Sequence, residues 1–240
     1  MKQPPSTVLD APVAASPLPS LDTLVRPLAD RLADSLPGHR AQEHMAPRHA
    51  ARRDQLSIKG KTCNQAGVMA LLYPSSKDGT PTVLLTVRSS NLPDHAGQVS
   101  FPGGRCDTDE PARRTALRET HEEIGVSPSQ ITVLGSLTPL YIPPSEFCVY
   151  PFVGALSQPP EASCATPEVD ALLPVPIPHL LDPDTRVIET WTLQGQSIEV
   201  PFYPVNEHAV WGATAMMLSE LVAVIRSLPR YASSSDESGA

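Results

Sequence analysis

The chain lacks an apolar run long enough to cross a membrane as a helix. The longest candidate, 209–225, contains Glu220 and is shorter than the roughly 20 residues that a bilayer requires. The first residues show no basic stretch followed by an apolar one, so we expect no secretory signal, and the final Ser-Gly-Ala is not a peroxisomal address. These absences argue against a membrane protein and lead us to expect a cytoplasmic one.

Cysteine is also scarce. The four cysteines, Cys63, Cys106, Cys148 and Cys164, show neither the spacing of a zinc site nor a paired disulfide framework. In a cytoplasmic protein we expect such thiols to be reduced. Because no basic partner is evident for Cys106, we interpret it as a space-filling residue and not as a nucleophile.

Basic residues are outnumbered: 18 Lys and Arg against 26 Asp and Glu give a net charge of −8. A chain without a basic stripe is not expected to bind nucleic acid independently of sequence. The 240 residues, 40% of them hydrophobic, suffice for one core with flanking segments. The 28 prolines concentrate at the N-terminus and around 139–183, which indicates long loops and a disordered start and not a second domain.

The organisation that we predict has four parts. Residues 1–19, rich in Pro, Ala and Ser, are expected to be disordered, and 232–240 to form a polar tail. Residues 20–62 should hold a helix, with leucines at helical spacing up to Leu36, and a basic linker. The linker is either solvated or a phosphate-attracting flap over a site. The main domain should span 63–231.

Within that domain, short apolar runs predict strands. Runs 68–73 and 83–88 flank a turn with Asp78-Gly79, so we expect them to pair as a hairpin. Further strands are expected at 131–137 and 149–154. A closing helix should begin at Trp211-Gly212 and run to about Ile225, with Trp211 as a core anchor or, alternatively, a stacking surface for adenine.

One helix is predicted with clear ends. Asp109 fits an N-cap, Pro111 fits the first turn, and Gly125 fits the C-terminal stop. One face of this helix should be shared by Arg113, Ala116, Leu117, Thr120 and Ile124.

Three carboxylates, Glu119, Glu122 and Glu123, lie on a neighbouring arc of this helix. Like charges at this spacing repel one another and disfavour an isolated helix. A hard divalent cation such as Mg²⁺ or Mn²⁺ would offset the repulsion, since it prefers oxygen ligands. A solvated acidic face is the alternative.

The whole pattern favours the metal. It runs from a Gly-Gly turn through Glu110, the pair Arg118-Glu119 and the pair Glu122-Glu123 to Gly125-Val126. This pattern resembles the signature of the Nudix hydrolases, with Thr120 where that signature usually has an aliphatic residue. The resemblance implies an α/β fold, a Nudix α/β/α sandwich around a mixed β-sheet, and metal-assisted hydrolysis of a nucleoside diphosphate linked to another group.

The resemblance also implies roles for residues. Glu119, Glu122, Glu123 and the carbonyl of Gly103 would hold Mg²⁺ or Mn²⁺. Glu122 or Glu119 would act as general base, with loop residues Glu146 and Glu168 as further candidates. Arg118 and Glu110 would form a salt bridge that orients the helix.

The stretch before the signature resembles the coenzyme A pyrophosphatase subfamily. The matching residues are Leu84, Leu85, Thr86, Arg88, Ser89, Gly97, Phe101, Pro102, Gly103 and Gly104. Pro93 replaces an Arg of that subfamily, and Glu146 replaces a Gly. His95 lies in the same loop, where we interpret it as an anchoring residue.

This second resemblance implies a small nucleotide substrate, coenzyme A or acyl-CoA, bound through Arg88, Ser89 and Gly104. The products would be 3′,5′-ADP and 4′-phosphopantetheine. An ADP-ribose, NADH or other nucleotide pyrophosphatase is the alternative enzyme, and an inactive ligand-sensing Nudix domain is the alternative of another class. We expect neither nucleic acid nor membrane as a partner, and a homodimer is possible.

Overall fold

A computed structural model describes residues 20–47, 53–91, 97–143, 145–193 and 195–229. Its helices are α1 (Leu21–Leu32), α2 (His39–Gln42), η1 (Glu43–Met45), α3 (Arg53–Leu56), α4 (Ala112–Ile124), η2 (Pro128–Gln130), α5 (Ile177–Leu181), η3 (Pro183–Thr185) and α6 (Gly212–Arg226). Its strands are β1 (Asn64–Pro74), β2 (Pro81–Arg88), β3 (Val99–Ser100), β4 (Gly103–Arg105), β5 (Thr132–Ser136), β6 (Leu140–Ile142), β7 (Phe147–Ala155), β8 (Val169–Pro176), β9 (Val187–Leu193), β10 (Gln196–Val205) and β11 (His208–Trp211). The predicted disorder at 1–19 and the tail at 232–240 lie outside the described residues.

The main sheet is mixed. Its central path, in the described residues, runs β3-β2-β1-β7-β5, while β4 pairs with β1, β6 with β7 and β8 with β2. Strands β1 and β7 are parallel, and the other pairs in this sheet are antiparallel. The predicted hairpin is confirmed as β1–β2, with Leu71 opposite Leu84.

Strands β1 and β2 part at one end of the sheet. Beyond the β1–β2 ladder, β3 pairs with β2 and β4 pairs with β1, so the segment 99–105 lies between the two strands. The Met69 N–H donates to the Pro102 carbonyl at 2.9 Å within this split. The split places the Gly103-Gly104 backbone beside α4.

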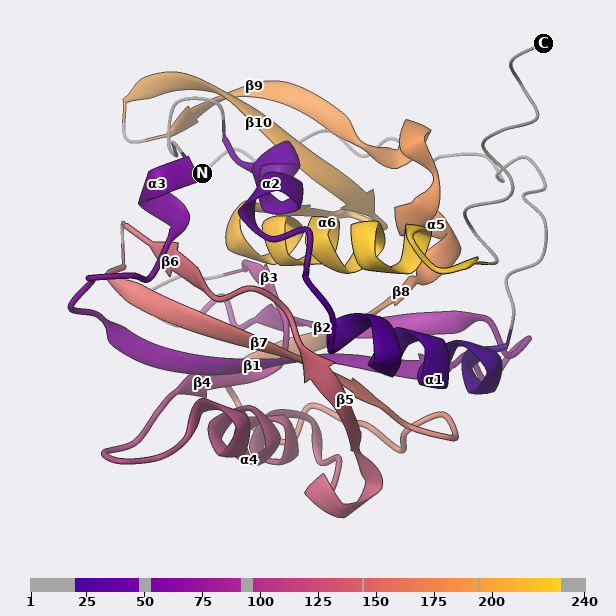
Figure 1. Cartoon of the computed structure of the whole chain (residues 1–240). Helices are drawn as coiled ribbons and strands as arrows, with labels where there is room; N and C mark the ends of the chain where they lie inside the picture. Colours follow the sequence, from indigo (N-terminus) through magenta and orange to yellow (C-terminus); the bar gives the residue numbers. More distant parts are fainter. Residues whose placement is uncertain (1–19, 48–52, 92–96, 144, 194, 230–240) are drawn as a thin grey trace, which may run out of the picture.

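Helices cover both faces of the sheet. Helix α4 lies on one face, and α1, α2 and α6 lie on the other (Figure 1). The alternation of β1 side chains divides the core accordingly, because Met69 and Leu71 belong to the cluster on the α4 side, whereas Ala70 and Leu72 belong to the opposite one. The expected α/β/α sandwich is confirmed.

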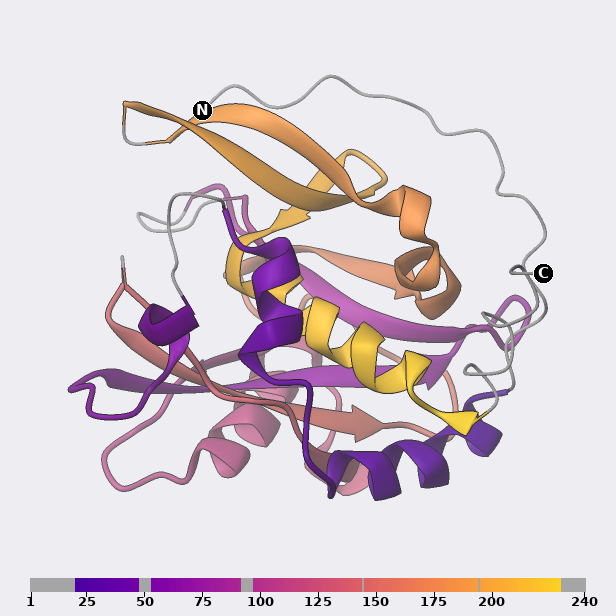
Figure 2. The ribbon, with the colours of Figure 1, turned by 45° about the horizontal axis from the view of Figure 1, so that its top comes forward.

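A second sheet was not predicted. Strands β9, β10 and β11 form an antiparallel three-stranded sheet that extends beyond α6 (Figures 1 and 2). Trp211, expected as a core anchor, is half-buried at the end of β11 and meets Trp191 edge-on, with ring centroids 5.4 Å apart. The many polar residues of 187–200, none of the β9 residues being fully buried, obscured the strand pattern.

The N-terminal helix is part of the core. Leu21, Leu24, Leu28 and Leu32 are all buried, and Leu32 packs over Gly135 of β5. The helix ends at Leu32, one turn earlier than predicted, and Pro27 lies within it at an exposed position. The predicted basic linker contains the short helices α2, η1 and α3.

The expectation that all cysteines are reduced is wrong for this structure. Cys63 and Cys148 form a disulfide, with Cα atoms 5.7 Å apart and a sequence separation of 85. The parallel pairing of β1 with β7 brings them together, since Gln65 lies opposite Cys148. Cys106 and Cys164 are free.

In the described part of the chain, no helix is both long and apolar enough to span a bilayer.

Candidate active site

Helix α4 carries the predicted carboxylates, but it begins later than expected. Its N-cap is Pro111, and Asp109 adopts a left-handed conformation with φ 62°, so the predicted Asp109 cap is wrong. Gly125 ends the helix in the left-handed region at φ 76°, as predicted. Of the residues predicted to share one face, Arg113 is exposed and Leu117 is half-buried. The buried residues are Thr115, Ala116, Thr120, Glu123 and Ile124.

Two glycines let α4 lie close to the sheet. A Cβ on Gly67 of β1 would collide with the Ala112 carbonyl at the start of α4. A Cβ on Gly104 would lie 2.6–2.8 Å from the carboxylate atoms of Glu119. These contacts bring the carboxylate side of α4 against β4.

The three carboxylates differ in burial. Glu123 is 8% exposed, and its Oε2 accepts a hydrogen bond from the Gly103 N–H at 3.1 Å. The Glu119 side chain is 19% exposed and that of Glu122 is 54% exposed. Burial raises the pKa of Glu123 to about 7, and burial also raises the pKa of Glu119. The two inner carboxylates therefore resist ionisation when no cation is present.

Arg118 bridges these residues. It donates to Glu110 at 3.1 and 2.9 Å, to Glu119 at 2.7 Å and to Glu122 at 3.1 Å. The structure thus contains the expected Arg118–Glu110 salt bridge. Hydrogen bonding from Arg118, with a second bond from Thr115, lowers the pKa of Glu110 to about 2. The bridge ties the loop before α4 to the helix.

A second group faces the helix from β2 and β8. The Arg88 guanidinium lies 3.7 Å from the Glu168 carboxylate. Glu168 repels Glu119 and Glu123 enough to contribute to their raised pKa values, whereas Arg88 opposes the shift at Glu123. The structure therefore brings Glu168 into the carboxylate group.

Ser89 holds the Glu168 loop in place. The Ser89 N–H donates to the Glu168 carbonyl at 2.8 Å, and Ser89 is only 1% exposed. The next residue, Ser90, donates its N–H to the Asp170 carboxylate at 2.8 Å. Asp170 was not predicted from the sequence, because its partner lies 80 residues away. The burial of Ser89 favours an anchoring role over direct contact with a substrate.

Glu146 directly precedes β7. Its φ of 55° is the left-handed conformation that glycine adopts readily, and its carbonyl accepts from the Asn64 N–H at 3.0 Å. The replacement of glycine thus preserves the turn. Pro93 and His95 lie outside the described residues.

Several residues of the upstream resemblance are core residues. Leu84, Leu85, Thr86 and Phe101 are all at most 2% exposed. They place Arg88 at the end of β2 and Gly103-Gly104 at the split, so their role is to position these groups.

A divalent cation fits the chemistry of this group. The donors are carboxylate oxygens, and their mutual repulsion and burial raise the pKa values of Glu119 and Glu123. Among the described residues, no three acidic, His or Cys side chains already converge on one point. Arg118 holds both Glu119 and Glu122, so a cation at these carboxylates would compete with its guanidinium.

Comparisons with known proteins agree with this arrangement. The chain is 47% identical over 87 residues to the uncharacterized Nudix hydrolase NudL of Pectobacterium atrosepticum, covering 36% of this chain and 45% of that relative. It is 37% identical over 160 residues to its namesake from Photorhabdus laumondii, covering 63% of this chain and 81% of the relative. The aligned region thus covers less than half of the length of the first relative and about four fifths of the length of the second.

Among solved structures, RenU, a Nudix hydrolase from M. smegmatis, is similar at 18% identity and a TM-score of 0.47, covering 69% of this chain and 88% of that one. The model of the NUDIX domain matches residues 64–190, which include β1, the split sheet and α4. With over half of the chain matched, this protein belongs to the Nudix hydrolase family.

Proposed function

We propose that the protein is a metal-dependent hydrolase that cleaves the diphosphate of coenzyme A or acyl-CoA into 3′,5′-ADP and (acyl-)4′-phosphopantetheine. The main support is the group of α4 carboxylates, of which the buried Glu123 bonds to Gly103 and Glu119 lies beside Gly104. The choice of coenzyme A rests on the resemblance of the stretch before the signature.

The residues suit this chemistry. Mg²⁺ or Mn²⁺, held by Glu119, Glu122, Glu123 and the Gly103 carbonyl, would neutralise charge on the diphosphate oxygens. Arg88 lies at the end of β2, where its guanidinium can attract a phosphate. The Gly104 backbone, free of a side chain, allows a phosphate to approach closely. Arg118, which is paired with Glu110, orients the α4 carboxylates.

Proton removal from the attacking water has two kinds of candidate. Glu122 or Glu119 would perform it from the helix, and Glu168 from the loop before β8. Among the loop residues we favour Glu168, because it lies 3.7 Å from Arg88 at the end of β2.

The substrate is tested by chromatographic product analysis with Mg²⁺ or Mn²⁺ and a panel of coenzyme A, acetyl-CoA, ADP-ribose, NADH and diadenosine polyphosphates. We expect 3′,5′-ADP from coenzyme A at the highest rate. Faster cleavage of ADP-ribose or NADH would support the alternative pyrophosphatase, with Pro93 marking the divergence. If no compound is cleaved, an inactive ligand-sensing Nudix domain is the interpretation that remains.

The site is tested with paired variants. We expect Glu122→Gln to reduce turnover more than tenfold without loss of fold, and Glu161→Gln, an exposed control, to leave it unchanged. Glu168→Gln should reduce turnover, whereas Glu146→Gln should not. Equal effects of the two loop variants would refute the role of Glu168.

Other expectations remain predictions. They are the domain limits at 63–231 with the 20–62 segment before it, a cytoplasmic location, and a possible homodimer.

A further inference from the structure

Three of the four cysteines gather on one face of the main sheet. Gln65 of β1 lies opposite Cys148 of β7, and the Cys106 N–H donates to the Gln65 carbonyl at 2.8 Å on the other side of β1. Residues opposite one another in neighbouring strands share a face, so Cys148 and Cys106 lie on the same side as Gln65. Cys63, two residues before Gln65, lies on that side as well.

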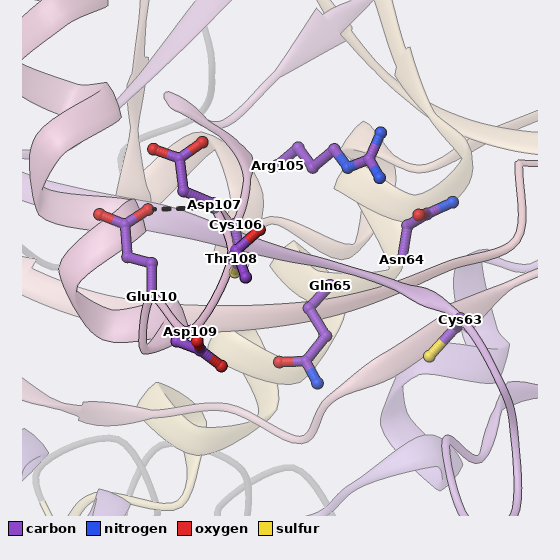
Figure 3. Close-up of a pocket in the computed structure, with 9 residues that line it drawn as sticks. All are labelled: Cys63, Asn64, Gln65, Arg105, Cys106, Asp107, Thr108, Asp109 and Glu110. Carbon is purple, nitrogen blue, oxygen red and sulfur yellow. Dashed lines mark hydrogen bonds between the residues drawn. The ribbon is translucent and has the colours of Figure 1, made fainter.

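Cys63 and Cys106 line a common pocket of about 370 Å³, formed by the segments 63–65 and 105–110 (Figure 3). Cys63 and Cys106 are half-buried, whereas Cys148 is 1% exposed. The disulfide sulfur that a thiol can reach is therefore that of Cys63, and the free thiol in the same pocket is that of Cys106.

The Cys106 backbone is bonded to Gln65, two residues after Cys63. Diagonal neighbours on adjacent strands have Cα atoms about 7–8 Å apart, and a disulfide requires less than about 7 Å. The segment 106–110 is neither helix nor strand. A shift of this loop along β1, with opening of the Cys106–Gln65 hydrogen bond, would carry Cys106 toward Cys63.

We propose that Cys106 is a thiol–disulfide exchange partner of the Cys63–Cys148 bond and that the exchange regulates the site on α4. The Cys106 thiolate attacks the Cys63 sulfur, a Cys63–Cys106 bond forms, and the Cys63–Cys148 bond breaks. Cys148 leaves as a thiolate and takes up the proton that Cys106 released to solvent. The number of disulfides is unchanged, so no oxidant or reductant is consumed.

The exchange reaches the site through Glu110. The loop that begins at Cys106 ends at Glu110, which holds Arg118 through two hydrogen bonds and also accepts from Thr115. Arg118 in turn holds Glu119 and Glu122. Drawing the loop toward Cys63 therefore loosens the support of the carboxylates, and the Cys63–Cys106 form should be the less active one.

The bond itself is tested by peptide mapping. Full-length protein is equilibrated in a buffer of reduced and oxidised glutathione, blocked with an alkylating agent and digested without reduction. We expect a Cys63–Cys106 peptide beside the Cys63–Cys148 peptide, and Cys63–Cys106 as the only internal disulfide in Cys148→Ala. Cys164, exposed and distant in sequence, serves as the internal control. Absence of a Cys63–Cys106 peptide in both proteins overturns the proposal.

The regulation is tested with matched variants. Diamide oxidation of Cys148→Ala should reduce its diphosphatase rate at least fivefold, and dithiothreitol should restore it. The double variant Cys148→Ala/Cys106→Ser should show no such change. An unchanged rate in the fully linked Cys148→Ala protein overturns the regulatory role. If the unmodified protein cleaves no diphosphate at all, the proposed function fails, while the mapping still decides the exchange.

Discussion

Single residues set the electrostatics of the site, and among the α4 carboxylates Glu123 is the most deeply buried. It is 8% exposed among the buried residues of α4, and it accepts a hydrogen bond from the Gly103 N–H. Its carboxylate is thus held where ionisation is unfavourable, as in sites that a cation completes.

This environment predicts a pH dependence of stability. Because burial raises the pKa of Glu123 from 4.5 to about 7, the folded state binds more protons than the unfolded state between these values, and stability falls as pH rises. In EDTA, we expect a loss of about 2 kcal/mol, or roughly 4–8 °C in Tm, from pH 5.5 to 7.5. The Tm of Glu123→Gln, measured by thermal unfolding, should not show this fall between pH 5.5 and 7.5. Equal slopes in both proteins would contradict the assignment.

Gly104 predicts a change in activity without loss of fold. In Gly104→Ala the new Cβ would meet the end of the Glu119 side chain, which can move, so we expect stability to change by less than about 1 kcal/mol. Turnover should fall at least tenfold, because Glu119 is displaced. A double-mutant cycle with Glu119→Gln checks the cause: the second substitution should add almost nothing. Additive losses would show that Gly104 acts independently of Glu119.

Elements are joined by a buried carboxylate on α6. Glu220 is fully buried and accepts four hydrogen bonds, from the Gly38 N–H, the Gln42 side chain, the Thr138 N–H and the Thr138 hydroxyl, at 2.6–3.1 Å. These donors come from the segment between α1 and α2, from α2 and from the β5–β6 connection. Glu220 thus fastens three elements to α6.

Removing this carboxylate should be costly. We expect Glu220→Ala to reduce the free energy of unfolding by roughly 2–4 kcal/mol, since several buried donors lose their acceptor. Ser219→Ala, which removes one hydrogen bond to the Ala41 carbonyl, should cost about 1 kcal/mol. Urea denaturation measures both. A similar cost for the two variants would mean that the Glu220 network contributes little.

At the scale of the whole molecule, the N-terminal helix belongs to the domain. Leu28 is completely buried, so we expect Leu28→Ala to cost about 2–5 kcal/mol in a single cooperative transition. Arg26→Ala, at an exposed position of the same helix, should cost less than about 0.5 kcal/mol. A separate early transition, or no loss in Leu28→Ala, would show that α1 folds apart from the core.

Local patterns predicted much of this architecture. The β1–β2 hairpin, the Gly125 stop and the closing helix depend on neighbouring residues, and the structure has them where the pattern indicated. The start of α4 was missed because Asp109 adopts a left-handed turn that its residue type also permits. The second sheet was missed because half-exposed strands give a weak alternation signal.

The sequence by itself determined the family and the residue types of the site, because the signature spacing is short and lies on one loop and helix. Only the tertiary structure decided where the two loop carboxylates, Glu146 and Glu168, lie. Glu168 lies beside Arg88 because β8 pairs with β2, whereas Glu146 directly precedes β7. The Cys63–Cys148 pairing likewise depended on the parallel β1–β7 contact, which no local pattern specifies.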